Sequence, residues 1–201
     1  MDDDTTLAAA RARHLAAAGL GDGGYDDPLV RLRFGPLTVT LPNTAGRRKA
    51  VPLHDLHHVL TGYPAGSWRG EFAISAWEIA AGCGRFLTGW AINLGGLAMG
   101  ALAYPRSTFA AFVRGRRSRA LYRDYPDGPT PELLAQPVAP MRARLRLDRA
   151  TEPPTMGDAV RFAIWMAIAL PALLVHLAGA LVLGPALWLL GPLFERRAHR
   201  A

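Results

Sequence analysis

The feature that most constrains this chain is a long apolar segment near its C-terminal end. Residues Phe162 to Phe194 carry no charged side chain, and His176 is the only strongly polar residue among them. About 20 such residues suffice to cross the hydrocarbon core of a bilayer. In water the segment would expose more apolar surface than a soluble domain tolerates, and a chain of 201 residues cannot bury a helix that is apolar on every side. We therefore predict a membrane-embedded helix within residues 160–197.

The sequence alone leaves two arrangements of this segment in the membrane. Two full spans need about forty residues, and Pro171, Pro185 and Pro192 favour breaks, so one span followed by a short interfacial helix competes with a shallow hairpin. Trp165 and Trp188 lie near its two ends, where aromatic residues commonly anchor at interfaces. Since arginines flank the segment and positive residues prefer the cytoplasm, we expect the inner (cytoplasmic) membrane, with the main domain on the cytoplasmic side.

Charge and cysteine content narrow the function classes. The formal net charge is +7, and Lys49 is the only lysine among 23 basic residues, so an anionic partner is plausible on charge alone. Six arginines and no acidic residue lie between Arg106 and Arg123, but the few aromatic residues there do not form a base-stacking platform. We therefore expect no nucleic-acid partner. The single cysteine, Cys83, excludes a disulfide framework and a cysteine-rich zinc site, so any metal must be held by histidine and carboxylate side chains.

The remaining pattern predicts a mainly α protein, a helical bundle with a short N-terminal extended or β segment and a C-terminal membrane-embedded helix. We divide the chain into an N-terminal helix with a flexible joint (1–28), a helical domain (29–150) and the hydrophobic anchor (160–197). The alternation in 29–41 indicates two short strands around Gly35-Pro36, or an extended lead-in. Helices are expected at 6–18, 53–61, 71–81, 86–104, 108–117 and, interrupted by prolines, 131–147.

A second uncharged stretch, Phe86 to Tyr104, is only marginally long enough to cross a membrane. Its glycines weaken a helix, so we interpret it as a core helix or a lipid-facing surface helix. Gly96 and Gly100 form a pair of small residues four apart, a spacing that lets a second helix approach closely.

The cluster that carries chemistry lies in His54-Asp55-Leu56-His57-His58. His54 and His58 are four residues apart, hence on one helical face, and Asp55 lies one position further round and can join them. Glu71 opens the next expected helix. Imidazoles and carboxylates projecting from facing helices are how helical bundles hold metals, and such a set suits Zn, Fe or Mn better than Cu(I), Ca or Mg.

Other interpretations of these residues remain open. The histidines can be a surface cluster, and Glu71 can serve only the N-terminus of its helix, where a carboxylate meets the positive end of the dipole. Glu78, seven residues after Glu71, is more typical of a buried hydrogen-bonded residue than of a ligand. His57 points about 100° away from His58, toward solvent or a supporting position.

At these residues the sequence resembles the Coq-four family of ubiquinone (coenzyme Q) biosynthesis proteins. The signature of that family is His-Asp, two residues, His, eleven residues, then Glu, which corresponds here to His54, Asp55, His58 and Glu71. The segments HDLHHVLTGYP and RGEFAISAWEIAAGCG are similar to its motif helix and its Gly-Glu helix, and the resemblance extends over about residues 50–147. Two departures stand out: the spacer before Glu71 has twelve residues, the extra one in the 64–70 loop, and 162–194 has no counterpart in usual members, which lie peripherally on a membrane.

The resemblance implies a divalent metal, Zn first and Fe or Mn as alternatives, held by His54, Asp55, His58 and Glu71, which would also be the catalytic residues. It implies a prenylated quinone precursor as the bound lipid, with carbon-one oxidative decarboxylation as the enzymatic reaction and the isoprenoid tail held along 86–104. The implied partners are the membrane, other quinone-biosynthesis enzymes and a second copy of the chain. The alternative is a non-catalytic lipid-binding scaffold that organises those enzymes. A hydrolase of phosphorylated lipids is a third hypothesis.

Overall fold

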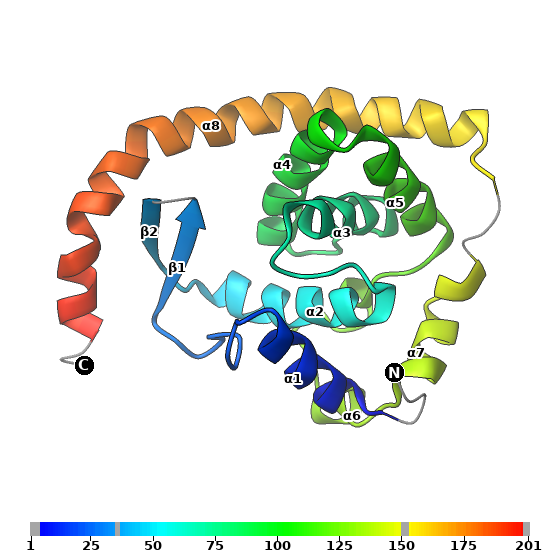
Figure 1. Ribbon diagram of the computed structural model, residues 1–201, viewed down its shortest axis with the longest axis horizontal. Coiled ribbons are helices and arrows are strands. Elements are labelled where there is room, and N and C mark those ends of the chain that lie inside the picture. The colour runs from blue at the N-terminus through cyan, green and yellow to red at the C-terminus, as the bar shows by residue number, and fades with distance from the viewer. Residues whose placement is uncertain (1–4, 35–36, 150–152, 199–201) are drawn as a thin grey trace.

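The computed structural model describes residues 5–34, 37–149 and 153–198, with the backbone only for 31–34, 37–42, 149, 183, 184 and 186–198. The chain is mainly helical, as the sequence predicts (Figure 1). The elements in chain order are α1 (Leu7–Ala17), β1 (Leu29–Phe34), β2 (Leu37–Pro42), α2 (Ala45–Thr61), α3 (Trp68–Ala81), α4 (Leu87–Ala103), α5 (Pro105–Arg117), α6 (Pro131–Leu134), α7 (Val138–Arg144) and α8 (Met156–Ala198), with short 3-10 turns at Leu121–Arg123 and Leu147–Arg149.

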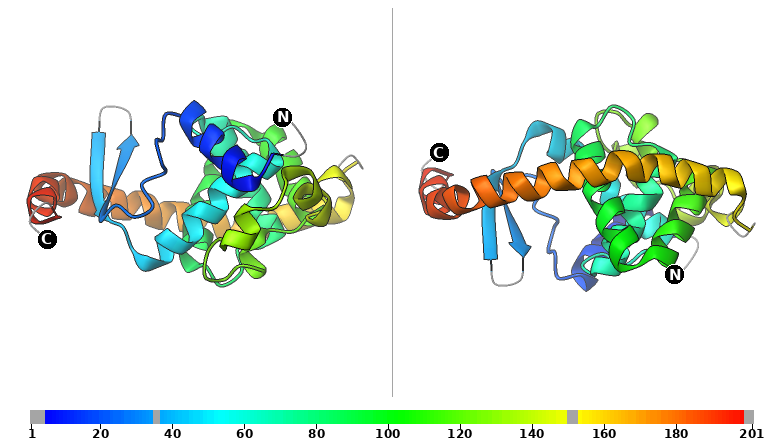
Figure 2. Two further views of the ribbon diagram at one scale, coloured as in Figure 1. Left: turned by 90° about the horizontal axis from the view of Figure 1, so that it is seen from below. Right: turned by 90° about the horizontal axis from the view of Figure 1, so that it is seen from above.

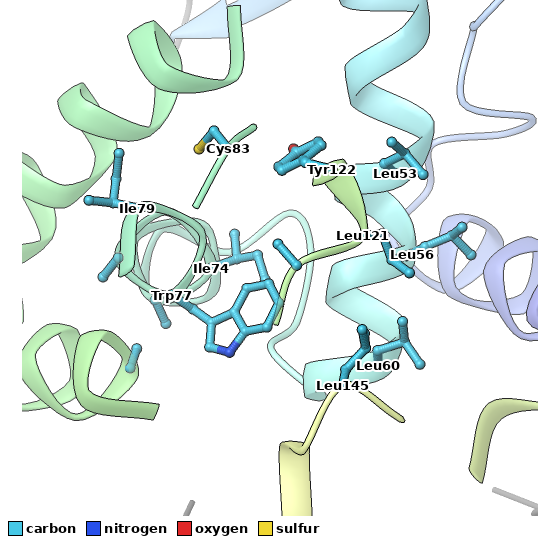
Figure 3. Close-up of a cluster of buried hydrophobic side chains, with 14 of the residues drawn as sticks. Leu53, Leu56, Leu60, Ile74, Trp77, Ile79, Cys83, Leu121, Tyr122 and Leu145 are labelled. Atoms are coloured by element: carbon cyan, nitrogen blue, oxygen red, sulfur yellow. The ribbon is translucent and has the colours of Figure 1, made fainter. Parts of the chain in front are cut away.

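Helix α3 lies at the centre of the core. Helix α2 passes along one side of it, α4 and α5 pack on the other, α1 and α7 pack on α2, and α6 packs on α1 (Figure 1). Figure 3 shows part of the core, where Leu121 and Tyr122 lie between helices α2 and α3. Leu53, Leu56 and Leu60 of α2 and Ile74 and Trp77 of α3 belong to the same buried cluster, and Trp77 is fully buried. This shared apolar cluster holds α2 and α3 in place, and with them the polar residues that they carry.

The N-terminal segment contributes to this core and to a small sheet. Thr6 caps α1 by accepting a hydrogen bond from the N–H of Ala9, and Leu7 and Ala10 are buried. Strands β1 and β2 pair antiparallel, with Leu29 opposite Pro42 and Phe34 opposite Leu37. Of the two interpretations of 29–41, the pair of strands is therefore confirmed. The turn itself, Gly35-Pro36, lies outside the described residues.

The glycines of α4 allow the close helix contact that their spacing predicts. A Cβ atom on Gly96 would lie 2.6 Å from the Cβ of Ser75 on α3 and closer still to its hydroxyl, and one on Gly100 would lie 2.7 Å from the Cβ of Phe72. These separations are too short for any side chain. The glycines therefore serve helix packing between α4 and α3, and the space beside them is filled by α3.

We expect Gly96→Ala to lower the free energy of unfolding by about 1–3 kcal/mol, because α3 and α4 must move apart to admit the methyl group. Thermal or denaturant unfolding in mild detergent measures the change. The matched control is Gly179→Ala in α8, where nothing lies within 4 Å of the added Cβ and no loss is expected. Equal stability of the Gly96 and Gly179 variants would contradict the close contact.

Helix α8 is continuous from Met156 to Ala198, so both a hairpin and a span followed by a separate interfacial helix are wrong for the described residues. Its prolines bend the helix rather than end it, and its C-terminal part turns toward the side on which α1 lies (Figure 1). Residues Met156–Val182 are long and apolar enough to cross a membrane, and their most apolar 18-residue window has a mean hydropathy of 2.1. Trp165 is not a free interfacial anchor, because its ring stacks on that of Trp90 of α4 with centroids 5.3 Å apart. The expectation for Trp188 concerns a side chain outside the described ones.

Candidate metal centre

Helix α2 brings the two predicted histidines together. The Nε2 atoms of His54 and His58 lie 3.1 Å apart. Their Nδ1 atoms face groups that can only accept: Nδ1 of His58 donates to the carbonyl of Tyr63 at 2.8 Å, and Nδ1 of His54 donates to Glu78 Oε1 at 3.1 Å. Each neutral ring therefore has its proton on Nδ1 and its lone pair on Nε2. Two facing lone pairs repel at this distance unless a cation lies between them.

Glu71 completes the group from the first turn of α3. Its Oε2 lies 3.6 Å from Nε2 of His54 and 3.5 Å from Nε2 of His58. Its other oxygen, Oε1, accepts the backbone N–H of Gly66 at 2.9 Å, which orients the carboxylate. Ligand atoms of His54, His58 and Glu71 thus all lie within 4.8 Å of one another. The twelve-residue spacer does not prevent Glu71 from reaching the histidines.

The loop between α2 and α3 explains the Gly-Glu pair in the sequence. Helix α2 ends at Gly62, whose φ of 79° lies in the left-handed region, and Ser67 caps α3 by accepting the N–H of Gly70. A Cβ on Gly70 would collide with the carbonyl of Pro64, only 2.9 Å from its carbon. The loop can therefore fold back over the start of α3 only because residue 70 is glycine, and this fold places Gly66 against Glu71.

Glu78 is a buried carboxylate that supports the site from behind. Its side chain is fully buried, and its Oε1 accepts from Nδ1 of His54, from Nδ1 of His57 at 2.6 Å and from the hydroxyl of Tyr122 at 3.0 Å, while its Oε2 accepts from Asn93 at 2.5 Å. The prediction that Glu78 is a buried hydrogen-bonded residue is confirmed. A carboxylate behind a histidine fixes the tautomer and ring orientation that present Nε2 to a metal.

His57 belongs to this supporting layer and not to solvent. It is fully buried, and its Nε2 accepts the backbone N–H of Leu121 at 2.9 Å, which leaves its proton on Nδ1 for Glu78. Burial lowers the pKa of His57, so the ring is neutral. The supporting alternative of the sequence interpretation is therefore confirmed and the solvent alternative is wrong.

In the site, burial and the neighbouring charged groups shift the pKa values of His54 and Glu71 in opposite directions. Burial alone would lower the pKa of His54, but the charge of Glu78 and hydrogen bonds with Glu71 and Glu78 outweigh it, and the pKa lies well above its ordinary value. Burial would raise the pKa of Glu71, yet its hydrogen bonds with the two histidines hold that pKa well below the usual range. The acids are thus ionised, and without a metal a proton on His54 supplies the positive charge between the two rings.

The structure does not bring Asp55 into this group. Its Oδ2 accepts a hydrogen bond from the hydroxyl of Tyr25 at 2.5 Å, on the segment that follows α1. One residue along a helix rotates a side chain by about 100°, so Asp55 leaves the face shared by His54 and His58. The contact also matters to Tyr25: burial and the Asp55 carboxylate both raise the pKa of its phenol. The group of possible ligands among the described residues therefore contains His54, His58 and Glu71, and the assignment of Asp55 as a ligand stays a prediction.

His14 is a site residue that the sequence interpretation missed. Its ring, on α1, stacks on the ring of His58 with centroids 5.5 Å apart, and its buried Nε2 has no hydrogen-bond partner among the described residues. Burial and the neighbouring His58 lower its pKa. A signal was present: Leu7, Ala10 and His14 are spaced three and four apart, which puts His14 on the buried face of its helix.

A groove of about 490 Å³ borders the histidines. His58 and His14 lie on its wall, and the rest of the lining comes from α1, the end of α2 and the loop after it: Ala10, Arg13, Val59, Gly62, Tyr63 and Pro64. Its volume is in the range of small-molecule sites, and most of its lining is apolar. Its lining residues belong to α1, α2 and the loop after α2, and α1 lies on the side of the core away from α8 (Figure 1).

Comparisons with known proteins add no further constraint. No family model, no curated protein and no solved structure matches the chain. The resemblance to the Coq-four family therefore rests on the motif residues themselves.

Proposed function

We propose that this chain is a membrane-associated, metal-dependent protein of prenylated quinone biosynthesis, which binds a prenylated aromatic ring beside a Zn²⁺ ion held by His54, His58 and Glu71. The observation that carries the metal is the convergence of two Nε2 lone pairs and one carboxylate oxygen on a single point. The substrate class rests on the resemblance of the motif. The position of the main domain on the cytoplasmic side rests on the flanking arginines.

The spacing of the three ligand atoms fits zinc. In a triangle with sides of 3.1, 3.5 and 3.6 Å, the point equidistant from the corners lies about 2.0 Å from each, which matches Zn–N and Zn–O bonds. Tetrahedral bonds of that length separate ligand atoms by about 3.3 Å, whereas octahedral Fe(II) or Mn(II) with cis ligands needs about 3.0 Å. The three separations admit both geometries, and the choice of zinc as the first candidate rests on the resemblance and on the donor set of two imidazoles and one carboxylate.

The ligand count favours catalysis over a purely structural ion. Structural zinc sites are usually closed by four protein ligands, whereas catalytic ones keep a position open for water or substrate. Here three ligands converge, and His58 also lines the groove. A bound Zn²⁺ would polarise a substrate oxygen or acidify a bound water. Glu78 and Tyr63 would hold the histidine rings, and the groove would take the aromatic ring.

One part of the expected lipid site needs revision. The glycines of α4 pack against Ser75 and Phe72 of α3, so the space beside them is not a slot for an isoprenoid tail. The apolar walls of the groove, Ala10, Val59 and Pro64, are better candidates for the part of the tail nearest the ring.

The test is turnover of a prenylated aromatic carboxylic acid by the full chain purified in detergent, with dioxygen supplied as the oxidant and release of CO2 as the readout, together with elemental analysis and mass spectrometry of bound lipid. We expect about one zinc per chain, and we expect His58→Ala to abolish turnover while the helical circular dichroism and the bound lipid persist. The matched control is His176→Ala, since His176 is an exposed histidine that hydrogen-bonds the carbonyl of Ala172 in its own helix and lies outside the metal site. Undiminished turnover in His58→Ala overturns the proposal; a metal-loaded wild type that binds the lipid but converts none supports the scaffold instead.

A further inference from the structure

The first half of α8 is attached lengthwise to the helical core. A stripe of its residues at helical spacing faces the core: Phe162 meets Phe109 and Phe112 of α5, Trp165 stacks on Trp90 of α4, and Ala169 is fully buried. Figure 2 shows α8 crossing over α4 and α5 in the view from above. The stripe continues to Leu173 and to His176, whose ring lies against Gly95.

The start of α8 is fixed by charge. Asp158 in its first turn is buried and forms ion pairs with Arg116 and with Arg117, 3.2 Å away, at the end of α5. Its carboxylate also accepts the N–H and the hydroxyl of Thr155 at 2.8 Å. A buried carboxylate held by two guanidinium groups is costly to separate, so α8 and α5 move as one body.

The outward side of the same helix is apolar and uncovered. The exposed fraction is 55% for Ile164 and 72% for Val175, and the other exposed large apolar residues of this part are Met156, Val160, Ile168, Leu170, Leu174, Leu177, Leu181 and Val182. Helix α4, on which α8 rests, adds exposed Ile92 and Leu102. A continuous apolar surface of this length is too large for a water-facing protein.

We propose that the first half of α8 lies parallel to the membrane plane, with this outward face in the lipid interface, so that the protein is held in one leaflet and does not span the bilayer. If α8 ran along the membrane normal, the attached core would enter the hydrocarbon with it, including the arginines at the end of α5, which is strongly unfavourable. In the plane, the apolar face meets acyl chains while exposed Arg106 and Arg161 reach anionic headgroups.

The C-terminal part of α8 turns toward the side of the core on which α1 lies (Figure 1). The proposed orientation therefore concerns the straight part of the helix, up to Val182. The groove beside His58 is lined by residues of α1, α2 and the loop after α2, and the orientation of α8 is argued from other residues, so separate experiments test the two proposals.

Depth measurement in vesicles tests the orientation. Environment-sensitive fluorophores are placed on single introduced cysteines at Val160, Ile168 and Val175, which are exposed, while the native Cys83 is buried. The full-length protein is reconstituted in phosphatidylcholine vesicles containing phosphatidylglycerol, with nitroxide quenchers near the headgroups or near the acyl-chain ends. Ala12→Cys on α1, labelled in the same way, is the control outside the lipid.

We expect equal, shallow depth at the three α8 positions, with stronger quenching by the headgroup-proximal nitroxide and none at Ala12. A spanning helix would instead change depth steadily, because Val160 and Val175 are separated by about 22 Å along the axis. Such a gradient overturns the inference. So does a buried fluorophore that neither nitroxide quenches, since that result means that a second copy of the chain covers the face.

Discussion

Glu78→Ala is expected to lower the free energy of unfolding by about 3–5 kcal/mol, the largest loss that we expect from any single substitution in the core. Four donors end on this one fully buried carboxylate, from His54, His57, Asn93 and Tyr122. Removing it leaves each donor without an acceptor in a region from which water is excluded, and it leaves a cavity. Denaturant unfolding followed by far-ultraviolet circular dichroism measures the change.

A second variant separates the charge of Glu78 from its shape. Glu78→Gln keeps the volume and one acceptor oxygen, and Asn93 can rotate its amide to present the oxygen that now lacks a partner. We therefore expect a smaller loss of stability but a zinc affinity lower by about 10–100-fold, because the ligand His54 loses the carboxylate behind it. Glu132→Ala, on the exposed surface, is the control and should melt close to wild type. A Glu78→Ala protein as stable as that control would contradict the network.

The sequence predicts the elements of the centre because helical periodicity is local. The four-residue spacing of His54 and His58 determines that their rings share a face, and the break at Gly62 followed by Ser67 and Glu71 determines that a second helix starts nearby. The prolines of α8 mislead the same reasoning. A proline removes one backbone hydrogen bond and bends a helix, but flanking apolar residues can carry the helix through it, as they also do at Pro52 of α2.

The contacts that periodicity cannot predict are those between distant segments. Tyr25 holds Asp55 from thirty positions upstream, and α1 brings His14 onto His58 from forty-four. Neither contact follows from a local pattern, because it depends on how α1 and the segment after it pack against α2. The motif that resembles the Coq-four family therefore predicts Asp55 as a ligand, while in the structure its carboxylate accepts a hydrogen bond from Tyr25.

The second large effect concerns zinc affinity, and it distinguishes a centre in which Glu71 is the carboxylate ligand from one in which Asp55 is also a ligand. We expect Glu71→Ala to weaken zinc binding by more than about a hundredfold, because it removes one of three converging ligands, and loss of a mere supporting group already costs 10–100-fold. Asp55→Asn keeps the volume and an acceptor oxygen for Tyr25, and it should change the zinc affinity by less than about threefold. Competition with a chromogenic zinc chelator measures both constants on protein stripped of metal.

Both substitutions remove one negative charge near the histidines. If these carboxylates acted on the cation only through their charge, the two variants would lose similar amounts of zinc affinity. A difference of at least tenfold between them is what direct ligation by Glu71 alone requires. An Asp55→Asn variant that loses zinc as completely as Glu71→Ala would mean that Asp55 turns from Tyr25 toward the ion in the loaded protein. The three-ligand centre would then be wrong, and the site would have four protein ligands and no open position, which removes the argument for catalysis.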